Sequence, residues 1–162
     1  MTDPLSASAR RVQEALAAAG SSAVVREYRV ACRTSAEAAS VLGCDVAQIA
    51  KSVIFRGAAS GRSILVITSG AHRVSTAKVE ALAGEAPAKA DAAFVREHTG
   101  FVIGGVAPIA HARPGIVLMD QTLLGFATVF PAGGTPQAMF AISPGELLRL
   151  SGARAADVIE QA

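Results

Sequence analysis

The sequence contains little cysteine, with only Cys32 and Cys44 among its 162 residues. A small protein held together by disulfides needs several cysteine pairs, so these two do not form such a framework. Neither has histidines beside it at the spacing of metal ligands, which argues against a zinc site. We therefore interpret both as small core or surface residues, and we predict no metal site.

Long uninterrupted hydrophobic runs are also missing. The one long uncharged stretch, residues 121–145, contains three prolines and several glycines, which exclude a membrane-spanning helix there. The N-terminal residues include Asp3 and Glu14 and show no basic segment followed by an apolar run, so they do not resemble a secretory signal. These features predict a cytoplasmic protein without a membrane partner.

An excess of one charge is missing as well. Fifteen lysines and arginines face thirteen aspartates and glutamates, a net charge of +2, which is too small for strong binding along a nucleic-acid duplex. We predict no sequence-specific DNA binding, and the charge leaves room only for a local phosphate contact.

The overall composition is that of a globular chain. Hydrophobic residues make up 51% of it and charged residues 17%, which excludes a disordered tail, a coiled coil and a collagen-like fibre. A chain of 162 residues has room for one domain with a sizeable core, so we expect a single domain over residues 1–162.

Apolar periodicity and capping residues predict five helices. They are expected over residues 5–19, 34–43, 75–82, 91–98 and 143–150. The second and fifth begin with the pairs Thr34–Glu37 and Ser143–Glu146, which have the spacing of a capping box, in which each side chain bonds the other residue's backbone. Asp45 is expected to cap a short turn after the second helix.

Short apolar segments between glycine- and proline-containing turns predict the strands of a mixed sheet. Residues 51–56 and 63–68 form a predicted hairpin of buried strands at its centre. The other expected strands are residues 23–30, 101–103, 116–119, 126–130 and 138–142. This order of helices and strands predicts an α+β (mixed α/β) fold, a mixed sheet flanked by helices.

The usual catalytic motifs are absent from the sequence. It has no G-x-S-x-G, no P-loop, no G-x-G-x-x-G and no H-E-x-x-H. His72, His98 and His111 lie far apart without paired spacing, so each is interpreted as a surface or capping residue rather than a base or a ligand.

Lys51 is the first of two features that stand out. It is one of only three lysines beside twelve arginines, and it stands at the entrance of the apolar segment Ser52–Phe55. A lysine at the end of a strand is usually just solvated, and a functional cation is the alternative. Position alone leaves both interpretations open.

The second feature is the glycine-containing segment Thr99–Pro108. Its glycines, Gly100, Gly104 and Gly105, allow the backbone to approach a ligand and to donate N–H groups to an oxygen. Glycines beside apolar runs also mark tight turns and bulges between strands. Both interpretations stay open on the sequence pattern alone.

Taken together, these segments resemble the YbaK/ProX family, free-standing relatives of the editing insertion domain of bacterial prolyl-tRNA synthetase. The resemblance runs in order from about residue 20 to about residue 155, and it rests on residues 33–43, 48–55, 100–108, 131–136 and 143–147. It implies the mixed sheet of that editing domain and no cofactor. It also implies trans-editing, in which a deacylase hydrolyses the ester of a tRNA mischarged with a small amino acid.

The resemblance assigns expected roles to particular residues. Lys51 matches the functional lysine of the family, residues 100–108 match its glycine-containing substrate loop, and Thr34 begins the helix that borders the pocket. The expected catalytic residues are Lys51, Gly104 and Gly105. The expected substrate-binding residues are Thr34, Ser35, Gly100, Val106, Ala107, Pro108 and His111. The implied partner is the 3′-terminal end of a mischarged aminoacyl-tRNA, and help from a synthetase or an elongation factor is a further hypothesis. Six arginines are candidates for supporting the stem of that RNA, although glutamates balance them as on an ordinary solvated surface. The six are Arg10, Arg11, Arg26, Arg29, Arg33 and Arg56.

Ester hydrolysis makes modest chemical demands that this sparse set of residues can meet. An aminoacyl ester is already activated, so it needs a placed water and a stabilised oxyanion. We expect Lys51 to pair with the terminal phosphate or the carbonyl region, and backbone groups near Gly104 and Gly105 to orient the carbonyl or the water. The ribose hydroxyl would carry the proton, because no side chain stands out as a general base.

Two alternatives follow from the same residues. The lysine and the glycine segment could hold a nucleotide or an RNA end without turnover, as a non-catalytic binding module of the same fold. A general hydrolase of small esters is the other alternative, and it would need a nucleophile that the sequence does not reveal.

Overall fold

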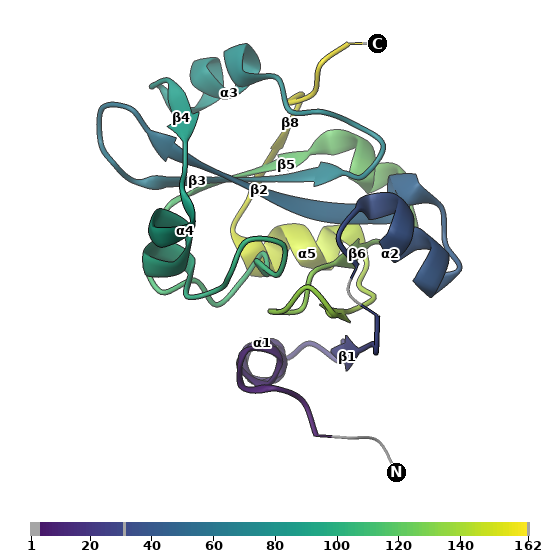
Figure 1. Cartoon of the computed structure of the whole chain (residues 1–162). Helices are drawn as coiled ribbons and strands as arrows, with labels where there is room; N and C mark the ends of the chain where they lie inside the picture. Colours follow the sequence, from purple (N-terminus) through teal and green to yellow (C-terminus); the bar gives the residue numbers. More distant parts are fainter. Residues whose placement is uncertain (1–3, 31, 162) are drawn as a thin grey trace.

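Figure 1 shows the computed structural model of the chain, which describes residues 4–30 and 32–161. The helices are α1 (Ala7–Ala18), α2 (Ser35–Leu42), α3 (Thr76–Ala83), α4 (Ala92–Thr99) and α5 (Pro144–Ser151), with short 3-10 helices η1 (Val46–Gln48) and η2 (Gln121–Gly125). The strands are β1 (Arg26–Glu27), β2 (Ile49–Gly57), β3 (Ser63–Ser69), β4 (Pro87–Lys89), β5 (Ile116–Asp120), β6 (Phe130–Pro131), β7 (Ala138–Met139) and β8 (Arg154–Ala156). The predicted α+β fold is confirmed.

Side-chain caps fix the starts of the helices where the sequence predicted them. The side chain accepts the backbone N–H of the residue three positions on at Thr34, Ser75, Asp91 and Ser143. The reciprocal bond expected at Thr34 is wrong, because the Glu37 carboxylate accepts from the Thr34 hydroxyl at 3.4 Å instead. At Ser143, the hydrogen bond that forms is the one from the Glu146 N–H to the Ser143 hydroxyl. The complete capping box belongs to Asp45 and Gln48, at the start of η1.

The main sheet has the strand order β4-β2-β3-β5-β8. β2 and β3 pair antiparallel from Ala50 opposite Ser69 to Arg56 opposite Ser63, which confirms the predicted central hairpin. β5 and β8 then join in parallel, so the sheet is mixed. β6 pairs in parallel with the first two residues of β2, and β1 pairs with β7 in a separate two-stranded ribbon.

The two faces of the sheet are covered by different elements (Figure 1). One face packs against α1, α4 and α5 in the larger core, whose buried residues include Leu16, Ile67, Phe101 and Leu147. The opposite face packs against α3 and the C-terminal segment. Successive residues of a strand point to opposite faces, so neighbouring residues of β2 belong to different surroundings.

Several expected strands are shorter than predicted or absent. Residues 101–103 do not form a strand but enter a turn closed by the Gly105 N–H, which donates to the Val102 carbonyl at 3.0 Å. Phe101 is buried as an anchor while Val102 and Ile103 are exposed. The other shortened predictions are residues 23–30, 126–130 and 138–142, which contribute only β1, β6 and β7. These pieces are set by long-range pairing, which a local pattern does not contain.

Candidate functional site

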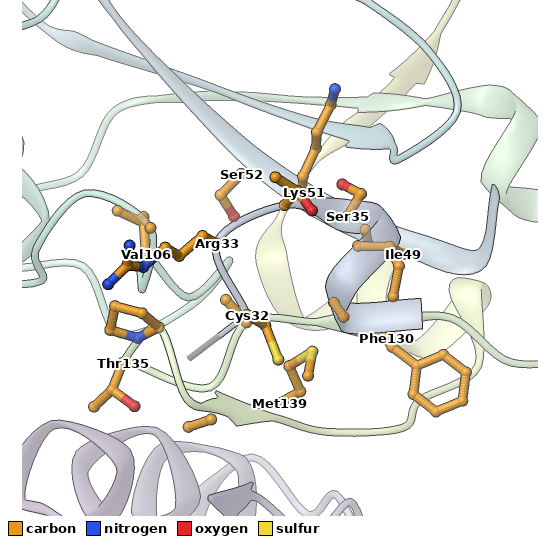
Figure 2. A pocket seen from close by; sticks show the side chains of 17 residues that line it. Cys32, Arg33, Ser35, Ile49, Lys51, Ser52, Val106, Phe130, Thr135 and Met139 are labelled. Carbon is orange, nitrogen blue, oxygen red and sulfur yellow. The ribbon is translucent and has the colours of Figure 1, made fainter. Parts of the chain in front are cut away.

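A cavity of about 170 Å³ lies where the start of β2, the beginning of α2 and two loops meet (Figure 2). Most of its lining residues are apolar, and four of them are alanines. The apolar residues are Ala38, Ile49, Ala50, Val106, Phe130, Ala132, Pro136, Ala138 and Met139. The remaining lining residues are Cys32, Arg33, Thr34, Ser35, Lys51, Ser52, Gly104 and Thr135.

One edge of β2 is left unpaired beside this cavity. On that edge β6 pairs with Ile49 and Ala50, and β4 pairs with residues 55–57. The edge between them, at residues 51–54, has no strand along it in the described part of the chain; we call it the open edge. An unpaired strand edge presents main-chain donors and acceptors to a ligand.

The glycine segment reaches the cavity through close packing with the loop at residues 133–136. A Cβ atom at Gly105 would lie 2.6 Å from the Cα of Thr135, so no other residue fits there without moving the backbone. Gly104 has a φ of 91°, a conformation that favours glycine. The glycines therefore bring two loops together, and the Gly105 N–H is already engaged in closing its own turn.

Arg11 and His111 fasten the outer end of this loop. The Arg11 guanidinium donates to the carbonyls of Thr99, at 3.0 Å, and Ala110, and it lies 4.5 Å from the centre of the Phe101 ring. Arg11 was among the candidates for supporting an RNA stem, and the structure shows its guanidinium bonded to these carbonyls inside the protein.

His111 lies 2.6 Å from the Ala107 carbonyl through its Nε2. Burial lowers the pKa of His111, the bond to Ala107 works against this, and Arg11 lowers the pKa further. A ring with a lowered pKa is neutral near pH 7. Its Nε2–H therefore donates to Ala107 and holds the loop from behind.

The structure brings together only part of the predicted site. Lys51, Thr34, Ser35, Gly104 and Val106 line the cavity. The other predicted residues lie outside its lining and support the loop: Gly100, Gly105, Ala107, Pro108 and His111. Ala107 is completely buried. These five residues therefore shape the loop from outside the cavity lining.

Lys51 lines the cavity but its amino group does not share it with the glycine segment. In the register of the hairpin Lys51 stands opposite Thr68, on the face away from the larger core. Figure 2 shows the side chain extending away from Val106. Burial, and then the neighbouring charge of Arg73, lower the pKa of the amino group. We expected the Lys51 ammonium and residues 100–108 to face one another across the cavity. The structure corrects this expectation, because the amino group lies on the other face of the sheet.

Ser52 is a lining residue that the sequence reasoning missed. Its hydroxyl is buried and has no hydrogen-bond partner among the residues that the structure describes. In Figure 2 it points toward the side where Arg33 and Val106 lie. The available signal was its position next to Lys51, because strand alternation sends neighbouring side chains to opposite faces.

The other histidines have local partners away from this cavity. His72 lies 3.0 Å from the buried Asp120 carboxylate, and His98 stacks on Phe94 within α4. Within residues 4–30 and 32–161, no group of three His, Cys, Asp or Glu side chains is arranged to hold a metal ion. None of the helices in this part of the chain has the length and apolar character needed to cross a membrane.

Comparisons with solved structures place this fold among similar proteins. A proposed trans-editing enzyme for prolyl-tRNA synthetase has a TM-score of 0.92 and 44% sequence identity, covering 98% of this chain and 100% of that one. A scaffold protein used for computational epitope grafting has a TM-score of 0.91 and 42% identity, covering 97% and 100%. The hypothetical protein APE2540 has a TM-score of 0.85 and 34% identity, covering 93% and 99%.

Sequence comparison agrees with these structural similarities. The uncharacterized protein YwhH of Bacillus subtilis (strain 168) is 33% identical over 127 residues, which cover 78% of this chain and 80% of YwhH. Residues 30–150 match the aminoacyl-tRNA editing domain family, which confirms the predicted resemblance. The matched range contains every residue of the cavity wall. This chain therefore belongs to the family of aminoacyl-tRNA editing domains.

Proposed function

We propose that this protein is a trans-editing deacylase, which hydrolyses the ester of tRNA mischarged with a small amino acid. The observation that carries the proposal is the cavity beside the open edge of β2, inside the range that matches the editing family. The cavity has an apolar wall, it lies beside the unpaired main-chain groups of the open edge, and Lys51 is one of its lining residues. An aminoacyl end has the matching parts: a side chain, a carbonyl and a phosphate close by.

The size and lining of the cavity favour a small amino acid side chain. Alanines at positions 38, 50, 132 and 138, together with Val106, surround a volume of about 170 Å³. A synthetase pocket separates amino acids that differ by one methylene by only about 10- to 200-fold, so errors need a second, narrower site. Entry limited by size would let this cavity accept small misacylated residues and exclude larger ones.

Lys51 is proposed to bind the terminal phosphate of the tRNA. Its amino group is partly buried and near Arg73, and both conditions disfavour its positive charge. A phosphate placed beside these two cations would relieve their repulsion and accept charge-assisted hydrogen bonds from both. This arrangement leaves the carbonyl region of the substrate to other donors of the cavity wall.

The proton in the proposed reaction moves through the substrate. The water oxygen attacks the ester carbonyl carbon, the ester bond to the ribose breaks, and the ribose oxygen takes up the proton that the water loses. None of the lining residues in the described part of the chain is a histidine, aspartate or glutamate. A neighbouring ribose hydroxyl is therefore the proposed proton carrier.

A panel of preformed mischarged tRNAs tests this function. Tritiated alanyl, seryl, threonyl and cysteinyl esters on several tRNAs are incubated with the protein, and the ester that remains is counted. The proposal expects faster loss than in buffer for at least one small amino acid, with correctly charged tRNAs of large amino acids unchanged. Retention of all esters together with measurable tRNA binding would favour the non-catalytic binding module.

A further inference from the structure

Main-chain groups of β2 alternate between its two edges. Ile49 accepts from the Gly70 N–H at 2.7 Å, and Gly57 donates to the Arg62 carbonyl at 2.8 Å. Odd-numbered residues of β2 thus direct their N–H and C=O groups toward β3, and the even-numbered Ser52 directs its own to the other side. That side is the open edge, so the Ser52 N–H faces the cavity rather than a neighbouring strand.

The Ser52 side chain leaves the strand on the same side of the sheet as the glycine segment. It stands opposite Ile67, which belongs to the larger core together with Val106 and Ala107. Its hydroxyl is buried without a partner in the described part of the chain, although it lines a cavity. Buried hydroxyls are normally hydrogen-bonded because an unpaired one destabilises the fold.

We propose that Ser52 is a catalytic residue whose hydroxyl and main-chain N–H together bind the carbonyl oxygen of the aminoacyl ester. Both donors belong to one residue and are held by a central strand, so they are in place before the substrate arrives. When water attacks, the carbonyl electron pair moves onto this oxygen, and the two donors stabilise the negative charge until the bond to the ribose breaks. The inference rests on the proposed deacylase function and adds the group that holds its oxyanion.

The alternative donor in the loop is less available for this task. The Gly105 N–H donates to Val102 at 3.0 Å and closes a turn. Lys51, the neighbour of Ser52, sends its amino group to the opposite face of the sheet. Ser52 is thus the lining residue that combines a buried unpaired hydroxyl with a strand N–H at the open edge.

Substitution of the hydroxyl separates a catalytic from a structural role. Ser52→Ala should lower kcat by about 10- to 100-fold and raise KM by up to about tenfold, because the hydroxyl contacts the bound carbonyl and acts more strongly on the developing charge, while the N–H remains. Ser52→Thr keeps the hydroxyl and should recover most of kcat. The melting temperature of Ser52→Ala should stay the same or rise, since an unpaired buried hydroxyl is removed.

Ser63→Ala is the matched control, because it makes the same chemical change at the far end of the hairpin. Its kcat should equal that of the wild type. Wild-type kcat in Ser52→Ala, or a fall in its melting temperature that accounts for the lost activity, would overturn the inference. So would equal losses in Ser52→Ala and Ser52→Thr.

Binding of an inert analogue keeps this inference distinct from the proposed function. Adenosine carrying alanine through a 3′-amide bond cannot be hydrolysed as an ester, and its affinity is measured by calorimetry. If the wild type binds it and Ser52→Ala binds it about tenfold more weakly, Ser52 contacts the carbonyl even if no tRNA in the panel is deacylated. Equal affinities of the two proteins for the analogue would overturn the contact between Ser52 and the carbonyl.

Discussion

Two polar sites on the sheet, one around Asp120 at the end of β5 and one at Ser52 within β2, differ in how their hydrogen bonds are satisfied. The Asp120 carboxylate is fully buried and accepts from the Thr68 hydroxyl, the Ser69 N–H and both the N–H and hydroxyl of Thr122, and it lies 3.0 Å from His72. The buried hydroxyl of Ser52, which stands opposite Ile67 on β3, has no partner in the described part of the chain.

The difference separates a structural cluster from a candidate binding site. A buried carboxylate with donors on both oxygens stabilises the fold, and losing one partner exposes the full cost of its burial. An unpaired buried donor at a cavity wall does not stabilise the fold and is available to a substrate. Changes around Asp120 should therefore alter stability, and changes at the cavity should alter activity.

Replacement of Lys51 should produce the largest effect on activity. Lys51→Ala removes the proposed phosphate contact, and loss of such a charge-assisted contact costs about 2–4 kcal/mol of transition-state stabilisation, roughly 30- to 1,000-fold in rate. Deacylation should fall below detection while the circular dichroism spectrum is retained. Near wild-type turnover in this variant would refute the role assigned to Lys51.

Replacement of Asp120 should lower stability and leave the activity of the folded protein unchanged, the reverse of the result expected for Lys51. Asp120→Asn turns one acceptor oxygen into a donor amide facing the donors of the cluster, so the free energy of unfolding should fall by about 2–3 kcal/mol. Urea unfolding measures the loss. At urea concentrations below the unfolding transition, the folded variant should deacylate tRNA at the wild-type rate. A stable but inactive variant would show that the Asp120 cluster and the cavity are not separate.

Replacement of Gly105 should have an intermediate effect on both properties. A Cβ there would lie 2.6 Å from the Thr135 Cα, so Gly105→Ala should push the two loops apart, with a stability loss of about 1–2 kcal/mol. Activity should fall about tenfold. Gly125→Ala is the control, since nothing lies within 4 Å of a Cβ at that position. Equal behaviour of the two variants would contradict the close packing of the loops.

The smallest expected effect is a change with pH in the stability difference between the wild type and Asp120→Asn. Burial alone would raise the pKa of Asp120, but hydrogen bonds from His72, Thr122 and Ser69 outweigh it and hold the pKa below its ordinary value of 3.8. A lowered pKa in the folded state adds stability above pH 3.8 that is lost as the pH falls through the folded pKa. The stability gap between the wild type and Asp120→Asn should narrow below pH 3.8, and a constant gap would contradict this account.

Local signals in the sequence were sufficient for the frame of the fold. The caps at Thr34, Ser75, Asp91 and Ser143 and the apolar runs of the central hairpin act within a few residues. The starts of α2, α3, α4 and α5 and the β2–β3 pair appear as predicted, and α1 begins at Ala7 rather than at residue 5. The three-residue strands β4 and β8 were missed. Such short pieces become strands only because a neighbour is already in place.

The site was less accessible to sequence reasoning than the fold. Lys51 and Gly104 were identified through a family resemblance, and both line the cavity. The direction of the Lys51 side chain depends on the register of the hairpin, and the open edge at Ser52 depends on where β4 and β6 stop. Pairing between distant segments determines both, so no local pattern contained them.

Nuclear magnetic resonance with the amide-linked alanyl adenosine tests the central claim most directly. If the aminoacyl end binds beside the open edge of β2, the backbone amide signals of Ser52, Gly104 and Val106 shift on titration, while that of Asp120 stays in place. Shifts that gather elsewhere on the protein, with Ser52 and Gly104 unchanged at saturation, would contradict the account.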